Sequence, residues 1–207
     1  MTKIVIINFG MGNLGSIQNM FKKIGTPSVI SSDPKDIVQA DKLVLPGVGS
    51  FDNGMNQLDE MGLIPVLHDK VIQNKTPVLG ICLGMQLMTL SSEEGKRSGL
   101  GWIDAVTVRF KHSGDMGNLK IPHMGWNSVT VMKDSALFAD MYHDPRFYFV
   151  HSYHAVCKNA RDVLTTTHYG YDFVSAFQSG NIMGVQFHPE KSHKFGMQLL
   201  KCFAGPC

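Results

Sequence analysis

The sequence lacks a strong net charge and long apolar runs, the features that mark nucleic-acid-binding and membrane proteins. Its formal net charge is only +2 over 207 residues, and its one basic cluster, Lys96-Arg97, is offset by the nearby Glu93-Glu94. This balance gives no reason to expect binding to nucleic acid or to an anionic membrane. No apolar run is long enough to cross a bilayer. The run Ile4–Ile7 follows Met1 so closely that we expect a first strand there and no signal peptide.

Cysteine is also scarce. The four cysteines form no Cys-x-x-Cys pair and no spacing typical of a zinc site. In a chain of this size they indicate reduced thiols in the cytoplasm, and we expect no metal and no cofactor. With 43% hydrophobic and 17% charged residues, the composition is that of a globular protein, and the length suits a single domain over residues 1–207.

The first half of the chain alternates apolar runs with helical patterns. Short apolar runs predict strands at residues 4–8, 28–30, 42–45 and 76–81, and the continuous run at 4–8 is typical of a strand buried on both faces. Helical spacing of apolar residues predicts helices at 14–25, 51–61, 64–73 and 83–90. This alternation is typical of an α/β fold with an open, mostly parallel sheet and flanking helices.

The second half has a different pattern. Apolar and polar residues alternate over short stretches separated by turns, as in strands with one buried and one solvent-exposed face. We expect these stretches to add antiparallel strands to the parallel core, and residues 192–203 to close the chain as a helix. The expected strands are 106–110, 129–131, 147–150, 155–157, 163–167, 174–177 and 182–187.

One stretch, Gly80-Ile81-Cys82-Leu83-Gly84, joins an expected strand to an expected helix. Gly-x-Cys-x-Gly at such a junction is the nucleophile-elbow pattern, with cysteine where a hydrolase has serine. The sharp turn strains its middle residue, and the two glycines let the backbone pass closely on either side. Cys82 would then lie at a helix amino terminus, whose free amides and dipole favour a thiolate. The plainer alternative is a buried cysteine in a glycine-rich turn.

A cysteine nucleophile needs a base, and the base needs a group that orients it. The best candidates follow an apolar strand in His188-Pro189-Glu190, where the proline stiffens the segment. His188 would take the thiol proton, and Glu190 would fix its tautomer and stabilise the imidazolium. Taken alone, the motif is more simply a capped strand end with a surface glutamate.

A third motif, Pro46-Gly47-Val48-Gly49, also stands at a strand end. Paired glycines let backbone amides turn toward a ligand, so this loop and the Leu83 amide are candidates for an oxyanion hole. An ordinary glycine turn is the alternative. The three motifs would share the crevice at the carboxyl ends of the strands, where open α/β sheets bind ligands.

The three motifs, read together as Pro46-Gly-Val-Gly49, Gly80-Ile-Cys-Leu-Gly-Met-Gln86 and His188-Pro-Glu190, resemble those of the class I (triad) glutamine amidotransferases, which have a flavodoxin-like fold. The likeness runs nearly end to end. Further stretches resemble one branch of that family, the glutaminase subunits of imidazole glycerol phosphate synthase. These stretches are Asn8-Phe-Gly-Met-Gly-Asn13, Pro122-His-Met-Gly-Trp-Asn127, Tyr148-Phe-Val-His-Ser-Tyr153 and Gln186-Phe-His-Pro-Glu-Lys-Ser192.

The resemblance implies hydrolysis of L-glutamine. Cys82 would attack the side-chain amide and form a thioester, and His188, oriented by Glu190, would protonate the leaving ammonia and then activate water. The family places an oxyanion-hole donor in the loop at Val48, beside the Leu83 amide. Positions near bound glutamine in the family correspond to Gly49, Gln86, Ser152 and Tyr153.

The resemblance also implies a partner. A cyclase subunit with a (β/α)8 barrel would form a heterodimer with the chain, take up the ammonia and make imidazole glycerol phosphate in L-histidine biosynthesis. Free ammonia becomes ammonium in water at neutral pH and loses its nucleophilic lone pair. A passage that excludes water between the two subunits would keep the ammonia reactive. Positions facing the partner correspond to Asn13, Trp126, Tyr148 and Lys191.

Three alternatives stay open at this stage. Asn8-Phe9 replaces an Asp-Tyr pair common in this branch, and paralogues of the branch supply ammonia to a synthase that amidates a sugar of a surface polysaccharide. A regulatory binding subunit would use the same fold without catalysis. A cysteine peptidase of a related flavodoxin-like family would need a different arrangement of the base.

His123 and His151 lack acidic or cysteine partners at ligand spacing, and we expect structural or interface roles for both.

Overall fold

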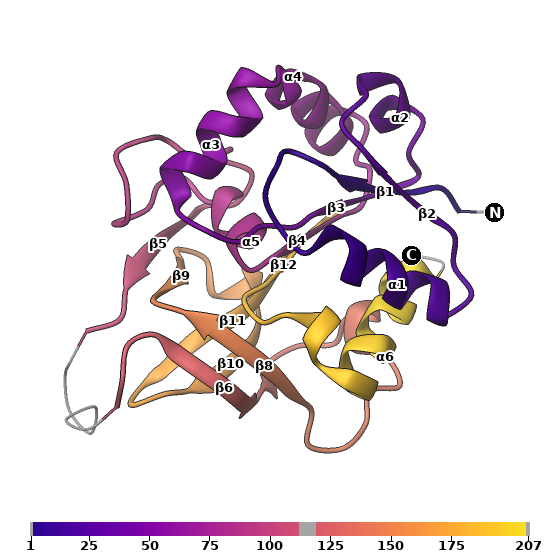
Figure 1. Ribbon diagram of the computed structural model, residues 1–207. Helices are drawn as coiled ribbons and strands as arrows, with labels where there is room; N and C mark the ends of the chain where they lie inside the picture. Colours follow the sequence, from indigo (N-terminus) through magenta and orange to yellow (C-terminus); the bar gives the residue numbers. More distant parts are fainter. Residues whose placement is uncertain (1, 112–118, 206–207) are drawn as a thin grey trace.

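A mixed β-sheet with helices on both faces forms the centre of the computed structural model, which describes residues 2–111 and 119–205 (Figure 1). The expected α/β fold with additional antiparallel strands is confirmed. The first-half elements are β1 (Ile4–Ile7), α1 (Leu14–Lys23), β2 (Ser28–Ser31), α2 (Pro34–Val38), β3 (Lys42–Leu45), α3 (Phe51–Glu60), α4 (Leu63–His68), η1 (Asp69–Gln73), β4 (Val78–Ile81) and α5 (Leu83–Leu87).

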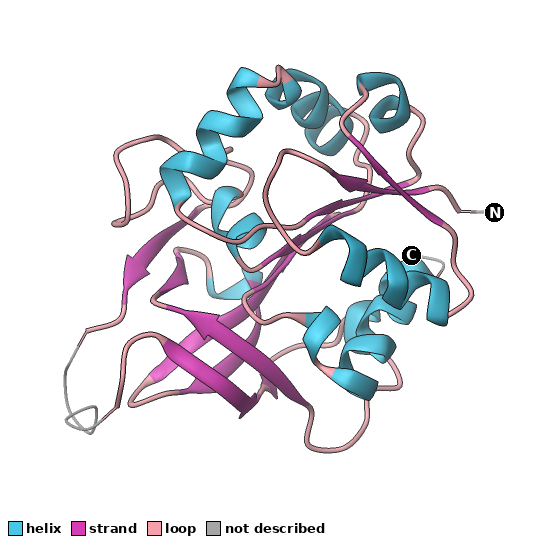
Figure 2. Cartoon of the chain, in the orientation of Figure 1, coloured by secondary structure: helices cyan, strands magenta, loops and turns pink. Residues whose placement is uncertain are grey.

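The second half contributes mainly strands, drawn in magenta in the lower part of Figure 2. Its elements are β5 (Ala105–Arg109), β6 (His123–Ser128), β7 (Thr130–Val131), η3 (Ala136–Phe138), β8 (Arg146–His151), β9 (Tyr153–Cys157), η4 (Ala160–Asp162), β10 (Val163–His168), β11 (Asp172–Ser179), β12 (Ile182–Val185), η5 (Pro189–Lys191) and α6 (His193–Ala204).

The sheet changes direction at β12. Along the order β2-β1-β3-β4-β12 every pairing is parallel, and beyond β12 the strands β11, β10 and β7 pair antiparallel. Strand β9 pairs with β11 and β5, while β6 and β8 form a separate two-stranded ribbon. Strands β3, β4 and β12 are therefore direct neighbours, and the loops after their carboxyl ends meet at one edge.

The parallel strands β1, β3, β4 and β12 are buried on both faces because helices cover both, whereas β2 at the sheet edge is partly exposed. Successive side chains of a strand point to opposite faces. Ile4 and Ile6 accordingly pack in the cluster that contains apolar residues of α1 and α6, whereas Val5 and Ile7 pack with those of α2, α3 and α4. Figure 1 shows α1 and α6 on one side of the sheet and α3 and α4 on the other. None of the helices in the described ranges is long and apolar enough to cross a membrane.

The differences from the sequence-based expectation include an early helix end and an unexpected strand. The helix expected to reach residue 90 ends at Leu87, because the Thr89 hydroxyl donates to the carbonyl of Gln86 at 2.8 Å and competes with the helical pattern. Strand β6 was not expected, since Gly125 and the polar residues around it have low strand propensity. Its alternating buried and exposed residues pair with β8 in continuous register from His123↔His151 to Ser128↔Arg146.

The turn between β4 and α5 predicts a sharp difference between two glycine substitutions. A Cβ added at Gly84 would lie 1.8 Å from the carbonyl oxygen of Leu45, whereas one at Gly15, exposed in α1, has no atom within 4 Å. We expect Gly84→Ala to lower the free energy of unfolding by at least about 3 kcal/mol, because backbone must move. Gly15→Ala should raise it by about 0.5–1 kcal/mol. Urea titrations followed by circular dichroism measure both, and equal effects would contradict this account of the turn.

Candidate active site

Cys82 stands in a strained turn between β4 and α5. Its φ of 53° and ψ of −110° lie outside the regions that non-glycine residues favour. The turn is tight on the Gly80 side as well, where an added Cβ would come within 2.8 Å of the backbone of Met85. The amide of Cys82 donates to the carbonyl of Val185 on β12 at 2.8 Å, and Cys82 as a whole residue is 7% exposed. The glycines and the neighbouring strand therefore hold the thiol at the sheet edge.

His188 and Glu190 follow β12, the strand beside β4. The Nδ1 of His188 lies 2.8 Å from Oε1 of Glu190, and both side chains are 2% exposed. The His188 backbone is fixed as well, because its amide donates to the carbonyl of Tyr148 on β8, and the Ser192 hydroxyl donates to its carbonyl. The glutamate is thus buried against the imidazole, which rules out the simpler interpretation of a surface residue.

The His188 imidazole is charged at neutral pH. Burial by itself lowers its pKa, but the neighbouring Cys82 thiol and the Glu190 carboxylate outweigh burial and raise the pKa to about 10. Its Nε2 is buried without a hydrogen-bond partner among the described residues. A charged ring that uses Nδ1 for Glu190 keeps the proton on Nε2 available for transfer.

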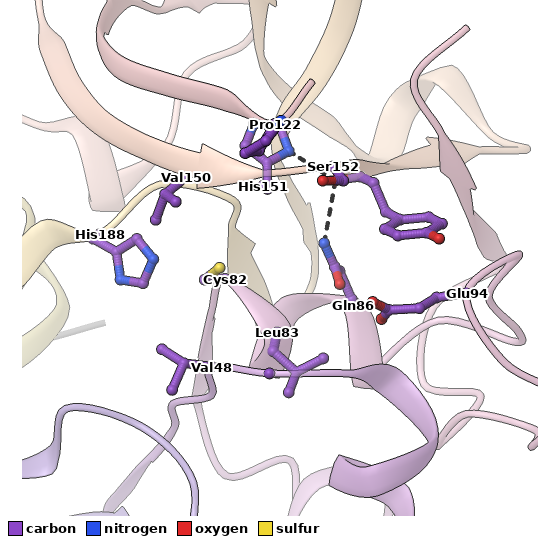
Figure 3. A pocket seen from close by; sticks show the side chains of 12 residues that line it. Val48, Cys82, Leu83, Gln86, Glu94, Pro122, Val150, His151, Ser152 and His188 are labelled. Atoms are coloured by element: carbon purple, nitrogen blue, oxygen red, sulfur yellow. Dashed lines mark hydrogen bonds between the residues drawn. The ribbon is translucent and has the colours of Figure 1, made fainter. Parts of the chain in front are cut away.

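A cavity of about 320 Å³ opens in front of the thiol (Figure 3). It brings together residues of α5, β8 and β9 and of the segments that follow β3, β4, α5 and β12. Eight of the residues predicted from the sequence line it, while Glu190 lies behind His188. The lining residues are Val48, Gly49, Cys82, Leu83, Gln86, Glu94, Pro122, Val150, His151, Ser152, Tyr153 and His188.

The loop after β3 packs directly against the elbow. A Cβ at Gly47 would come within 2.9 Å of Cβ of Leu83, so the loop can approach the turn only without a side chain there. Gly49 has a φ of +111°, and Val48 between the two glycines is 46% exposed at the cavity. The two candidate oxyanion residues, Val48 and Leu83, therefore lie on the same wall.

Glu94 and His151 also line the cavity, although neither was predicted to do so; a structural or interface role was expected for His151. Glu94 follows α5 by seven residues, and its Oε2 accepts the amide of Phe51 at the start of α3 at 2.8 Å. His151 is 6% exposed, and its Nε2 lies 3.0 Å from Nδ1 of His123. Only the pairing of β6 with β8 brings these two histidines, 28 positions apart, together.

The histidines around the cavity differ in charge. Burial lowers the pKa of His123 to about 4 and lowers that of His151 well below its ordinary value. Both rings are therefore neutral at pH 7, whereas His188 is cationic. A second cationic histidine near the thiol would compete with His188 for the negative charges of the site. Burial of His123 and His151 keeps both rings neutral and so prevents this competition.

Three of the four predicted partner-facing residues gather on the outer face of the β6–β8 ribbon and the adjoining turn. Trp126, 47% exposed, stands opposite Tyr148, with ring centroids 6.4 Å apart. The Nζ of Lys191 lies 5.6 Å from the Tyr148 ring centroid. Asn13 precedes α1, which packs next to the turn that contains Lys191.

Comparison with known proteins identifies the class of protein. The fold matches PurLQS from Thermotoga maritima with a TM-score of 0.72, at 14% identity over 98% of this chain and 97% of that one. It matches the glutaminase domain of Trypanosoma brucei CTPS with a TM-score of 0.64, at 15% identity over 99% and 94% of the two chains. The family model of glutamine amidotransferase class-I matches residues 5–204, and the chain belongs to that family. The family resemblance read from the motifs is confirmed.

Several relatives of this chain share one name, imidazole glycerol phosphate synthase subunit HisH. The imidazole glycerol phosphate synthase subunit HisH 2 of Methanococcus maripaludis is 56% identical over 97% of this chain and 98% of its own length. The protein of the same name from Pseudomonas aeruginosa is 48% identical over the same shares, and HisH of Sulfurimonas denitrificans is 49% identical over 97% and 96%. The resemblance to this branch is confirmed over nearly the whole chain.

The raised pKa of His188 predicts how stability depends on pH. Because the folded-state pKa of about 10 exceeds the ordinary 6.5, the proton on His188 stabilises the fold fully below about pH 6.5, and this contribution is lost as the pH rises toward 10. In Glu190→Gln the carboxylate is gone, so the loss of unfolding free energy over that pH range should be smaller. Urea titrations across the range measure it.

Asp172→Asn is the matched control, because Asp172 pairs with His168 at 2.7 Å on the surface, where both side chains are 71% exposed. Exposed ion pairs contribute little, so its pH profile should follow the wild type. The interpretation of His188 would be wrong if Glu190→Gln and wild type lost stability in parallel.

Proposed function

We propose that the chain is a single-domain glutaminase that hydrolyses L-glutamine and delivers the ammonia to a partner subunit that makes imidazole glycerol phosphate in histidine biosynthesis. The observation that carries the proposal is a buried thiol, imidazole and carboxylate at one cavity in a class-I amidotransferase chain. Relatives 48–56% identical carry the name of that synthase subunit.

The chemistry follows from the charges at the site. The Cys82 sulfur attacks the side-chain carbonyl carbon of glutamine, and the carbonyl electron pair moves to oxygen, where the amides of Val48 and Leu83 are the proposed donors. As the C–N bond breaks, Nε2 of His188 gives its proton to the departing nitrogen, so ammonia and a thioester form. The neutral imidazole then removes a proton from water, which attacks the thioester and releases glutamate and the sulfur. Glu190 holds the ring through both steps.

The cavity offers groups for the rest of the substrate. Glutamine carries an α-ammonium and an α-carboxylate, and the Glu94 carboxylate lines the cavity. We assign Glu94 to the α-ammonium, in addition to the expected glutamine-binding residues Gly49, Gln86, Ser152 and Tyr153. An opposite charge in a confined site both binds the substrate and orients it over the thiol.

The partner in this proposal is a cyclase with a (β/α)8 barrel, and the two proteins form a cytoplasmic heterodimer. Its contact face comprises Asn13, Trp126, Tyr148 and Lys191. The support is the exposed Trp126 beside the half-buried Tyr148, because large aromatic side chains left at a surface are typical of protein interfaces. A direct transfer keeps ammonia from becoming ammonium.

Removal of the nucleophile tests the glutaminase. Cys82→Ala should lower the rate of glutamate formation from glutamine by at least about a thousandfold, because no other group in the cavity can form the thioester. Cys202→Ala is the matched control, since Cys202 lies on α6 and bonds to Ala139 away from the cavity. Undiminished ammonia release by Cys82→Ala would refute the proposed chemistry.

The role of Glu94 is tested by Glu94→Gln. This substitution keeps an oxygen for the amide of Phe51 and removes the negative charge. We expect KM for glutamine to rise about tenfold, with kcat within about threefold, because a single charge-assisted contact is lost in ground and transition states alike. Steady-state kinetics decide, and an unchanged KM would exclude Glu94 from the binding of the α-ammonium.

The identity of the partner is tested by reconstitution. Glutaminase activity of the purified chain is measured with the cyclase subunit and, separately, with a synthase that amidates a polysaccharide sugar. Stimulation by the cyclase supports the histidine pathway. Stimulation by the sugar-modifying synthase alone would replace that assignment and leave the glutaminase chemistry unchanged.

A further inference from the structure

Gln186 is a completely buried amide next to the thiol. It follows β12, and its residue accessibility is 0%. Its Nε2 lies 3.7 Å from Sγ of Cys82, and its Oε1 accepts from Nε2 of Gln86 at 3.0 Å. Burial of an amide in a protein core is costly unless the group is hydrogen-bonded, and the sulfur is the partner that the Nε2 of Gln186 has here.

The strand pairing explains why Gln186 reaches the thiol. Strands β4 and β12 are parallel, with Ile81 opposite Val185, so the next residues, Cys82 and Gln186, leave the sheet side by side. The amide of Cys82 bonds to the carbonyl of Val185 at 2.8 Å and fixes this register. The register therefore places the two residues side by side, and the strained turn at Cys82 directs the thiol toward Gln186.

The orientation of the Gln186 amide is fixed from outside. The carbonyl oxygen of Tyr153 can only accept, so Gln86, 3.2 Å away, must turn its NH2 group toward it. The second hydrogen of that group goes to Oε1 of Gln186. Gln186 then has only its own NH2 group left for the sulfur of Cys82. The Nδ1 of His151 donates to the same Tyr153 carbonyl at 2.7 Å and holds the acceptor in place.

We propose that Gln186 is a further catalytic residue, whose side-chain N–H donates to the sulfur of Cys82 and stabilises the thiolate. A hydrogen bond to a charged acceptor is stronger than one to a neutral group, so this contact favours the ionised over the protonated thiol. The same bond stabilises the sulfur when it leaves the thioester. This second step rests on the proposed glutaminase function, whereas the first does not require glutamine.

The test follows alkylation of Cys82 by iodoacetamide in Gln186→Met, with mass spectrometry of the Cys82 peptide. Methionine has a similar size and no N–H. We expect alkylation about tenfold slower than wild type near pH 7, and a difference that disappears at alkaline pH, because a thiol then ionises without a hydrogen-bond donor. With glutamine, kcat should fall about tenfold and KM should stay within about threefold.

Two controls accompany the variant. Gln178→Met removes a different hydrogen-bonded glutamine, on β11, whose Oε1 accepts from Ser135, and should leave Cys82 alkylation unchanged. Alkylation of Cys202 in the same samples reports any general loosening of the fold, because its partners Ala139 and Gln198 lie away from the site. Gln186→Leu, with its shorter apolar side chain, replaces the methionine variant if the latter does not fold.

Two outcomes would overturn the proposal. Equal alkylation rates of Gln186→Met and wild type near pH 7 would show that the N–H does not stabilise the thiolate. A rate reduced by the same factor at every pH would show that the substitution only blocks access. Slower alkylation near pH 7 that recovers at high pH supports the role of Gln186, even if the wild type proves unable to hydrolyse glutamine.

Discussion

The close approach of α5 to the carboxyl ends of β3 and β4 is the constraint on which the site depends. Gly84 touches the carbonyl of Leu45, and Gly80 leaves no room for a side chain against Met85. The chain can turn from strand to helix in so little space only by placing Cys82 in a strained backbone conformation. That conformation directs the thiol out of the sheet and toward the segment after β12. The position of the thiol is therefore a consequence of backbone packing.

The site combines one charged and two neutral histidines within a small volume. His188 gains its charge from two neighbours, the thiol and a buried carboxylate, which together overcome the effect of burial. His123 and His151 have no such carboxylate, so burial keeps their rings neutral. The same residue type is thus cationic in one place and neutral in the other. The difference comes from Cys82 and from Glu190, two residues beyond His188.

The β6–β8 ribbon connects the surface with the site. Its outer face presents Trp126 and Tyr148, and its inner face contributes the two neutral histidines. Its backbone also accepts the amide of His188 through the carbonyl of Tyr148. In the proposed heterodimer, a subunit that covers the ribbon would therefore contact an element whose backbone is hydrogen-bonded to His188.

The sequence by itself determined the parallel core, the elbow at Cys82 and the pair His188-Pro189-Glu190, because apolar periodicity, glycine spacing and proline act locally. It also predicted eight of the residues that line the cavity. Only the tertiary structure decided that Glu94 and His151 join them, and that Gln186 reaches the thiol. These contacts depend on strand register and on loop packing between residues up to 104 positions apart. A local sequence pattern cannot predict such contacts. The burial of a side chain, its charge state and its hydrogen-bond partners are fixed only when strands distant in the sequence pair.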